Sequence, residues 1–136
     1  QNYLKNVIQK HHVYKNTNIL TEGTYTGLVY EILKNGKRVL EANDPKGHCV
    51  ITATNKDWIS KTIIGEFRDN EINGTASCIT HYTNEYVSIY SGKWKNNQKH
   101  GKGTYLIYDN NKLLSRRILN HYEDGNLIKT SPLTNF

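Results

Sequence analysis

The sequence is poor in apolar residues, proline and cysteine, and each shortage narrows what the chain can be. Hydrophobic residues make up 36% of its 136 positions, which is too few to build a thick central core. No stretch approaches the roughly 18 consecutive apolar residues of a membrane-spanning helix, so no transmembrane segment is expected. The two cysteines do not decide the redox compartment.

Methionine is absent, and the sequence begins at Gln1. A mature protein that has lost its secretory signal would look like this, and so would an artificially shortened chain, so the localisation stays open. The formal net charge is +6, from 18 Lys and Arg against 12 Asp and Glu. This excess is compatible with an acidic partner, and equally with a lysine-rich composition that has no functional meaning.

A repeated spacing is the main feature that the sequence does have. Five turn-forming residues follow one another at intervals of 27 positions: Asn16, Asn43, Asn70, Asn97 and Asp124. A second, shorter series keeps the same interval: Asp57, Asn84 and Asn111. A fixed period in this range is typical of repeat architectures. We therefore interpret the chain as about five copies of one unit.

Segments rich in β-branched and aromatic residues lie between these turns, for example residues 49–52, 77–80 and 103–108. They show no helical periodicity, and the turns leave strands of about 6–9 residues. These features predict an all-β fold, an antiparallel meander of about five β-hairpin repeats. Residues 1–136 would form a single domain, with residues 1–12 as an N-terminal cap (a strand or a short helix) and 131–136 as a loose tail.

Residues 90–105 resemble a MORN repeat, the membrane occupation and recognition nexus motif. Tyr90, Gly92 and Trp94 match its opening pattern of tyrosine, glycine and an aromatic residue at alternate positions. A turn, a His-Gly-x-Gly segment at 100–103 and a threonine-aromatic pair at 104–105 follow in the family's order. Residues 63–75 match about half of the pattern. The 27-residue period is longer than the family's own, so the chain resembles a divergent member.

The resemblance implies a curved, single-layer antiparallel sheet of consecutive hairpins. It implies no catalytic residues and no cofactor, because the repeats of this family serve as scaffolds, dimerisation surfaces and docking sites. Binding to acidic lipids has been proposed for the family. Its bacterial relatives include antitoxin-like and immunity-like proteins, which cover the active surface of another protein.

Two groups of side chains are candidates for partner binding. The aromatic group is Trp94, Phe67, Tyr90 and Tyr105, and the basic group is Lys93, Lys95 and Lys99. Strand alternation predicts that the aromatic residues line one face, where they either pack between repeats or form exposed anchors. The lysines surround one hairpin, where they are either simply solvated or grip an anionic group. Lys93 and Lys95 should point away from Trp94.

Cysteine and histidine chemistry receives little support. Cys49 and Cys78 would lie two strand spacings apart, about 9–10 Å, so we expect free and buried thiols. Cys78 and His81 would face opposite sides of a strand, and no metal site is expected. Glycines such as Gly65, Gly92 and Gly103 would mark bends, or places where a facing aromatic ring needs space.

These observations predict a non-catalytic repeat scaffold that binds a protein partner on one face of the sheet. An immunity or antitoxin role and self-association through a sheet edge are two forms of this hypothesis. The alternative is peripheral binding to anionic lipid or another polyanion through the basic aromatic hairpin around Trp94. Nucleic acid is not expected as a partner. Lysines spread over both faces would weaken the lipid alternative.

Overall fold

The computed structural model describes residues 8–16, 23–52 and 57–133, and for residues 8–16 it describes the backbone alone. Strands account for nearly all of these residues, because β-branched and aromatic residues alternate with polar ones between turn-forming asparagines. The strands are β1 (Ile8–Asn16), β2 (Gly23–Lys34), β3 (Lys37–Ala42), β4 (Asp44–Thr52), β5 (Trp58–Arg68), β6 (Glu71–Tyr82), β7 (Val87–Lys95), β8 (Gln98–Tyr108), β9 (Leu114–Glu123) and β10 (Asn126–Pro132).

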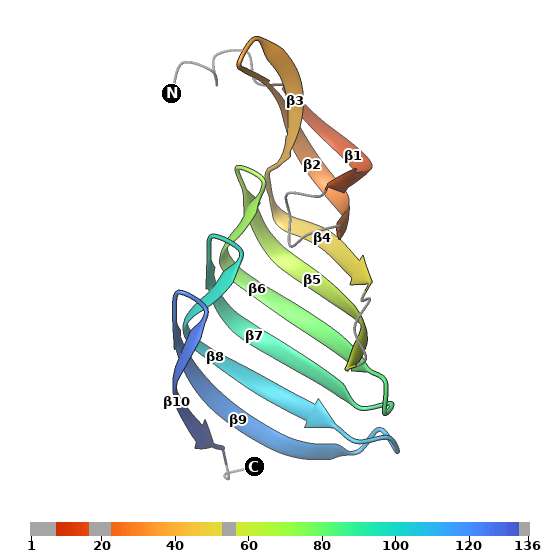
Figure 1. Ribbon diagram of the computed structural model, residues 1–136, viewed down its shortest axis with the longest axis vertical. Helices are drawn as coiled ribbons and strands as arrows, with labels where there is room; N and C mark the ends of the chain where they lie inside the picture. Colours follow the sequence, from red (N-terminus) through yellow and green to blue (C-terminus); the bar gives the residue numbers. More distant parts are fainter. Residues whose placement is uncertain (1–7, 17–22, 53–56, 134–136) are drawn as a thin grey trace.

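All of these strands belong to one antiparallel sheet, which is curved and open at both edges (Figure 1). Its order is β1-β2-β4-β5-β6-β7-β8-β9-β10, so strands that follow one another in the sequence are neighbours in space. The exception is β3, which pairs with the distal part of β2 in a hairpin that projects beyond the rest of the sheet. The predicted antiparallel meander is confirmed.

Tight two-residue turns join β2 to β3, β5 to β6, β7 to β8 and β9 to β10. Both residues of each turn have positive φ, which is the type I′ geometry whose twist matches that of antiparallel strands. The four turns are Asn35–Gly36, Asp69–Asn70, Asn96–Asn97 and Asp124–Gly125. Asn, Asp and Gly adopt this backbone at the lowest cost, which explains why the sequence places them there.

In two of these turns the second residue fastens a repeat to the one before it. The backbone N–H of Asn70 donates to the carbonyl of Ala42 at 2.9 Å, and Oδ1 of Asn70 accepts from the N–H of Ala42 at 3.1 Å. Asn97 makes the same pair of bonds with Ile72, at 3.0 and 2.8 Å. These bonds explain why asparagine, and not only glycine, recurs with the repeat.

The 27-residue spacing shifts by one position at the last turn. Asp124 is the first residue of its turn, whereas Asn70 and Asn97 are second residues. Gly125 therefore occupies the position equivalent to Asn97, and its N–H donates to the carbonyl of Lys99 at 3.0 Å. A glycine has no side chain to form the second bond of the pair.

Asn16 and Asn43 do not lie in tight hairpin turns, which differs from the prediction. Asn16 is the last residue of β1 and pairs with Gly23. Asn43 lies between β3 and β4, both of which pair with β2, and its N–H donates to the carbonyl of Leu28 at 3.1 Å. The tight turn of this unit comes earlier, at Asn35–Gly36, because β2 and β3 extend into the projecting hairpin.

The second series of turn residues lies at the opposite ends of the strands. Asn84 is in the connection between β6 and β7, and Asn111 is in the connection between β8 and β9. The side chain of Asp109 accepts a hydrogen bond from the N–H of Asn111 at 2.9 Å. Asp57 precedes β5, and its carbonyl accepts from the N–H of Thr83 at 3.2 Å. The Asp109 bond stabilises a single connection, whereas the bond between Asp57 and Thr83 joins two neighbouring connections.

Buried apolar side chains from most of the strands gather on one face of the curved sheet, called the inner face below. Tyr25 of β2 and Phe67 of β5 meet there edge to face, with 5.1 Å between ring centroids. The core continues through Ile63, Cys78 and Trp94 as one connected cluster. Each hairpin therefore buries its apolar side mainly against its neighbours, as expected for a repeat sheet.

Gly103 shows why a glycine is needed opposite an aromatic ring. Tyr90, which is only 1% exposed, lies so close to Gly103 that a Cβ atom at position 103 would overlap its ring. The missing side chain lets the tyrosine ring pack across the backbone of the adjacent strand. This is one of the two roles predicted for the repeat glycines.

The two ends of the chain are partly described. Residues 8–12 of the predicted cap belong to the edge strand β1, and residues 1–7 lie outside the described ranges. Ser131 and Pro132 belong to β10, where they pair with Leu119 and Ile118, so these two residues are not part of a loose tail, and residues 134–136 lie outside the described ranges. In the described part of the chain no helix could cross a membrane.

Candidate partner-binding site

Three of the four aromatic candidates are buried. Phe67, Tyr90 and Trp94 are only 2%, 1% and 6% exposed. The indole N–H of Trp94 donates to the carbonyl of Ala76 at 3.1 Å, which gives its polar atom a partner. These residues therefore take the first of their two predicted roles, packing between repeats, and are not exposed anchors. Tyr105 is half-buried beside them.

The lysines of the predicted basic hairpin separate onto two faces of the sheet. Lys93 and Lys95 are exposed and flank the buried Trp94 in β7, so they point to the outer face. Lys93 donates to Oγ1 of Thr75 at 3.2 Å. Lys99, in contrast, is half-buried against the aromatic residues of the inner face. The hairpin is consequently not one continuous basic surface.

Lys99 lies among tyrosines contributed by three adjacent strands. Tyr90 is at the centre, with ring centroids 5.8 Å from Trp94, 5.0 Å from Tyr105 and 5.9 Å from Tyr122. The ammonium group of Lys99 is 5.0, 5.0 and 5.6 Å from the ring centroids of Tyr90, Tyr105 and Tyr122, within the range of cation–π attraction. Lys99 also donates a hydrogen bond to the hydroxyl of Tyr105.

This environment changes how the groups ionise. Burial lowers the pKa of Lys99, the nearby Cys78 thiol opposes that shift, and the positive charge of Lys61 adds to it. Burial also raises the pKa of Tyr90 to about 12, with Tyr122 contributing in the same direction. The positive charge of Lys61 thus disfavours the charged form of Lys99.

Lys61 is a functional candidate that no sequence pattern marks. Its ammonium group lies 4.7 Å from the centroid of the Trp58 ring. Residues three apart in a regular strand face opposite sides, but the pairing of β5 with β6 is irregular between Trp58 and Ser60. That irregularity brings Trp58 and Lys61 to the same face, and no local sequence signal announces it.

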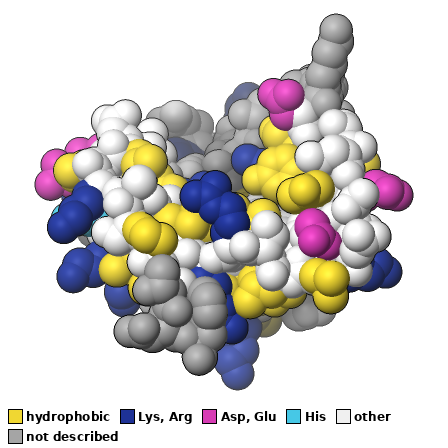
Figure 2. All heavy atoms as spheres, turned by 90° about the horizontal axis from the view of Figure 1, so that it is seen from below, with side chains coloured by type: hydrophobic (Ala, Val, Ile, Leu, Met, Phe, Trp, Pro, Cys, Tyr) yellow, Lys and Arg dark blue, Asp and Glu magenta, His cyan; other side chains and the backbone are white. Residues whose placement is uncertain are grey.

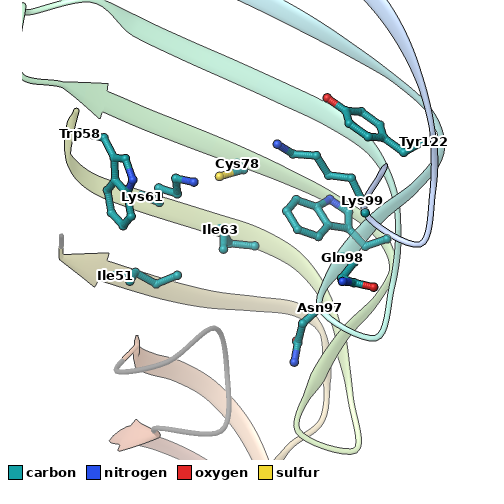
Figure 3. Close-up of a pocket in the computed structure, with 11 residues that line it drawn as sticks. Ile51, Trp58, Lys61, Ile63, Cys78, Asn97, Gln98, Lys99 and Tyr122 are labelled. Atoms are coloured by element: carbon teal, nitrogen blue, oxygen red, sulfur yellow. The ribbon is translucent and has the colours of Figure 1, made fainter. Parts of the chain in front are cut away.

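A cavity of about 370 Å³ lies on the inner face between these groups (Figure 3). Six of the residues that line it define its chemistry: Trp58, Lys61, Cys78, Trp94, Lys99 and Tyr122. Lys61 and Lys99 extend from β5 and β8 toward the part of the cavity where Cys78 lies. The described residues that line it include no Asp or Glu. Figure 2 shows Lys or Arg side chains near the middle of the molecule, bordered by hydrophobic ones.

The two cysteines are free and buried, as predicted. Cys49 is in β4 and Cys78 is in β6, with β5 between them. His81 is exposed whereas Cys78 is buried, so the two side chains do not converge. Across the described ranges, no group of three or more His, Cys, Asp or Glu side chains could hold a metal ion.

Stacked hairpins, repeat-to-repeat asparagine bonds and a basic aromatic cavity define an open β-repeat scaffold. A protein-family model, the MORN repeat, matches residues 90–112, which include Tyr90, Trp94, Lys99 and Tyr105 of the cluster. The chain thus contains a MORN repeat, and the resemblance carried by Tyr90, Gly92 and Trp94 is confirmed. No curated protein matches the chain.

Proposed function

We propose that this chain is a non-catalytic scaffold that binds a protein partner through the inner face of its sheet. The observation behind this proposal is the cavity of about 370 Å³, which combines aromatic walls with two half-buried lysines. A volume in this range can receive a small group or a protruding side chain. MORN repeats commonly mediate interactions with proteins or membranes, which supports a binding role.

An immunity or antitoxin role is one form of this function. The inner face would then cover the active surface of another protein, with the cavity receiving a projecting side chain of that surface. Self-association is another form, because the outer edge of β10 has no neighbouring strand within the described part of the sheet. Both forms require a protein as the partner.

Peripheral binding to anionic lipid is the second candidate. Lys93 and Lys95 favour it, since both are exposed on the outer face of one hairpin. However, Lys99 belongs to the inner face and Trp94 is buried, so neither adds to that outer surface. Each lysine near an anionic membrane contributes only about 1 kcal/mol, and two would hold the protein weakly.

Site-specific photo-cross-linking tests the proposal. A benzophenone amino acid is placed at Trp58 on the inner face and, in a matched control, at Lys95 on the outer face. After irradiation in an extract of the source organism, the inner position should give one discrete protein adduct that the outer position does not give. Capture of acidic lipid alone, lost when the salt is raised, would instead support the lipid candidate.

A further inference from the structure

We propose that the cavity recognises an acidic segment of the protein partner, in which one Glu or Asp carboxylate inserts between Lys61 and Lys99 while a neighbouring apolar side chain packs beside Trp58. This inference rests on the proposed function and names the chemistry of its partner. It follows from the charge of the cavity, from the position of its lysines and from the apolar part of its lining.

No carboxylate among the described residues compensates the positive charge of the cavity. Lys61 and Lys99 both line it, and neither forms an ion pair with a carboxylate among the described side chains. The lysines contact aromatic rings and a tyrosine hydroxyl instead. Two like charges in a partly buried site are destabilising unless an opposite charge joins them, so an anion placed between them relieves the repulsion of both.

The position of the lysines favours a side chain over a membrane. Both lysines line the cavity on the inner face of the curved sheet, among residues contributed by β4 to β9. A flat bilayer surface meets only the rim of such a face, whereas a carboxylate on a protein segment can reach inward. The exposed lysines Lys93 and Lys95, which a membrane could reach, are on the other face.

The lining near Trp58 is apolar, in contrast to the part formed by Asn97 and Gln98, and it explains the second half of the proposal. Ile51 and Ile63 border the cavity on the side of Trp58, and both are buried in the core. A partner residue adjacent to the carboxylate would bury its side chain against these groups and Trp58. The preferred ligand is therefore an acidic residue beside an aliphatic one, not a stretch of negative charge alone.

A peptide titration followed by NMR tests this recognition directly. The probe is a terminally blocked Leu-Glu-Leu-Glu-Leu peptide, and the matched control peptide carries Gln in place of Glu. Trp58 and Trp94 are the only two tryptophans of the chain and both line the cavity, so every indole N–H signal reports on the site. The Glu peptide should cause saturable shifts at millimolar or lower concentration, with binding at least about tenfold weaker for the Gln peptide.

Substitutions test whether the peptide binds in the cavity or elsewhere on the surface. Lys61→Gln should weaken binding of the Glu peptide by about tenfold, and Lys93→Gln, on the outer face, should leave it unchanged. Lys61 is the first choice because Lys99 packs among three tyrosines, and Lys99→Gln is used only where its thermal unfolding matches that of the native chain.

The contrary outcomes are distinct. Equal binding of the Glu and Gln peptides, no saturable shift, or an equal loss in Lys93→Gln would overturn the acidic recognition. Binding to phosphatidylserine vesicles without binding to the peptide would overturn it in favour of a membrane. If a partner cross-links at position 58 and Lys61→Gln retains it equally well, the proposed scaffold function would still be supported. Only the proposed recognition of an acidic segment would then be refuted.

Discussion

Tyr90 illustrates how a single residue of this sheet depends on strands that are distant in the sequence. Its ring contacts Trp94 in its own strand, Tyr105 in the next and Tyr122 in the one after, and it packs over Gly103. Because the sheet has one layer, such contacts along the inner face replace the second layer that usually covers a sheet.

Replacing the glycine beneath Tyr90 should destabilise the fold. In Gly103→Ala the added methyl group overlaps the buried ring, so the ring or the strand must shift, at a cost of about 1–3 kcal/mol. Gly36→Asn is the matched control, since nothing lies within 4 Å of its Cβ position and asparagine tolerates the positive φ of 74°. Urea unfolding measures both, and a Gly103→Ala variant as stable as the native chain would contradict this packing.

Burial of Cys49 should make stability fall at alkaline pH. Burial, reinforced by the nearby Cys78, raises the pKa of Cys49 from 9.0 to about 11. Between pH 9 and 11 the thiol ionises in the unfolded state but stays protonated in the folded state. This difference stabilises the unfolded state by about 2–3 kcal/mol as the pH approaches 11. Below pH 9 the thiol is protonated in both states, and the effect is absent. Cys49→Ala removes it.

The difference in unfolding free energy between the native chain and Cys49→Ala checks this sign. It should be constant up to about pH 9 and then shift in favour of the alanine variant as the pH approaches 11. Comparing two variants at each pH cancels the titration of the tyrosines and Lys99. A difference that stays constant across the range would show that Cys49 does not ionise differently in the two states.

At the scale of the elements, the type I′ hairpin is the unit that repeats. Asn70 and Asn97 supply both the positive φ of the turn and the side-chain bond to the preceding repeat. The turn chemistry is local, and so it could be predicted from the sequence. The partner of each side-chain bond could not be predicted, because it lies far away in the sequence. Asn70 binds Ala42, 28 residues earlier, and Asn97 binds Ile72, 25 residues earlier.

Two substitutions at Asn97 separate its roles. Asn97→Gly keeps the positive φ of 66° and loses the side-chain bond to Ile72, which should cost about 1 kcal/mol. Asn97→Ala also forces a Cβ into the left-handed region and should cost about 1 kcal/mol more. Asn96→Gly, in the first turn position, is the control and should be close to neutral. If Asn97→Gly proves as stable as the native chain, the bond between repeats contributes nothing.

At the scale of the whole molecule, a one-layer repeat sheet should not be equally stable throughout. β7 and β8 have neighbours on both sides and carry the aromatic cluster, whereas β10 pairs only with β9 among the described strands and is almost entirely exposed. Interactions in such arrays extend mainly to nearest neighbours, so the ends open first.

Hydrogen exchange should therefore reveal a gradient along the sheet. Amides of β7 and β8 are expected to exchange slowest, and amides of β10 fastest among the strands from β5 onward, because opening β10 exposes little apolar surface. The measurement is residue-resolved exchange by NMR under native conditions. Equal protection of β7 and β10 would mean that the sheet opens only as a whole.

The sequence by itself determined the all-β class, the consecutive hairpins, the turns at Asn70 and Asn97, and the opposite faces of Trp94 and Lys93. All of these depend on rules that act within a few residues: alternation along a strand and the positive φ that asparagine tolerates. A MORN repeat could be recognised for the same reason, since its pattern lies within residues 90–112.

Only the tertiary structure decided which side chains form the cavity. The irregular pairing near Trp58 turned that tryptophan to the inner face, beside Lys61, and the long β2–β3 hairpin moved the tight turn away from Asn43. Curvature then brought Lys61 and Lys99, which lie on β5 and β8, into one site. Bulges, strand lengths and curvature arise from the packing of many strands together, and they therefore leave no signal in the short segments that they rearrange.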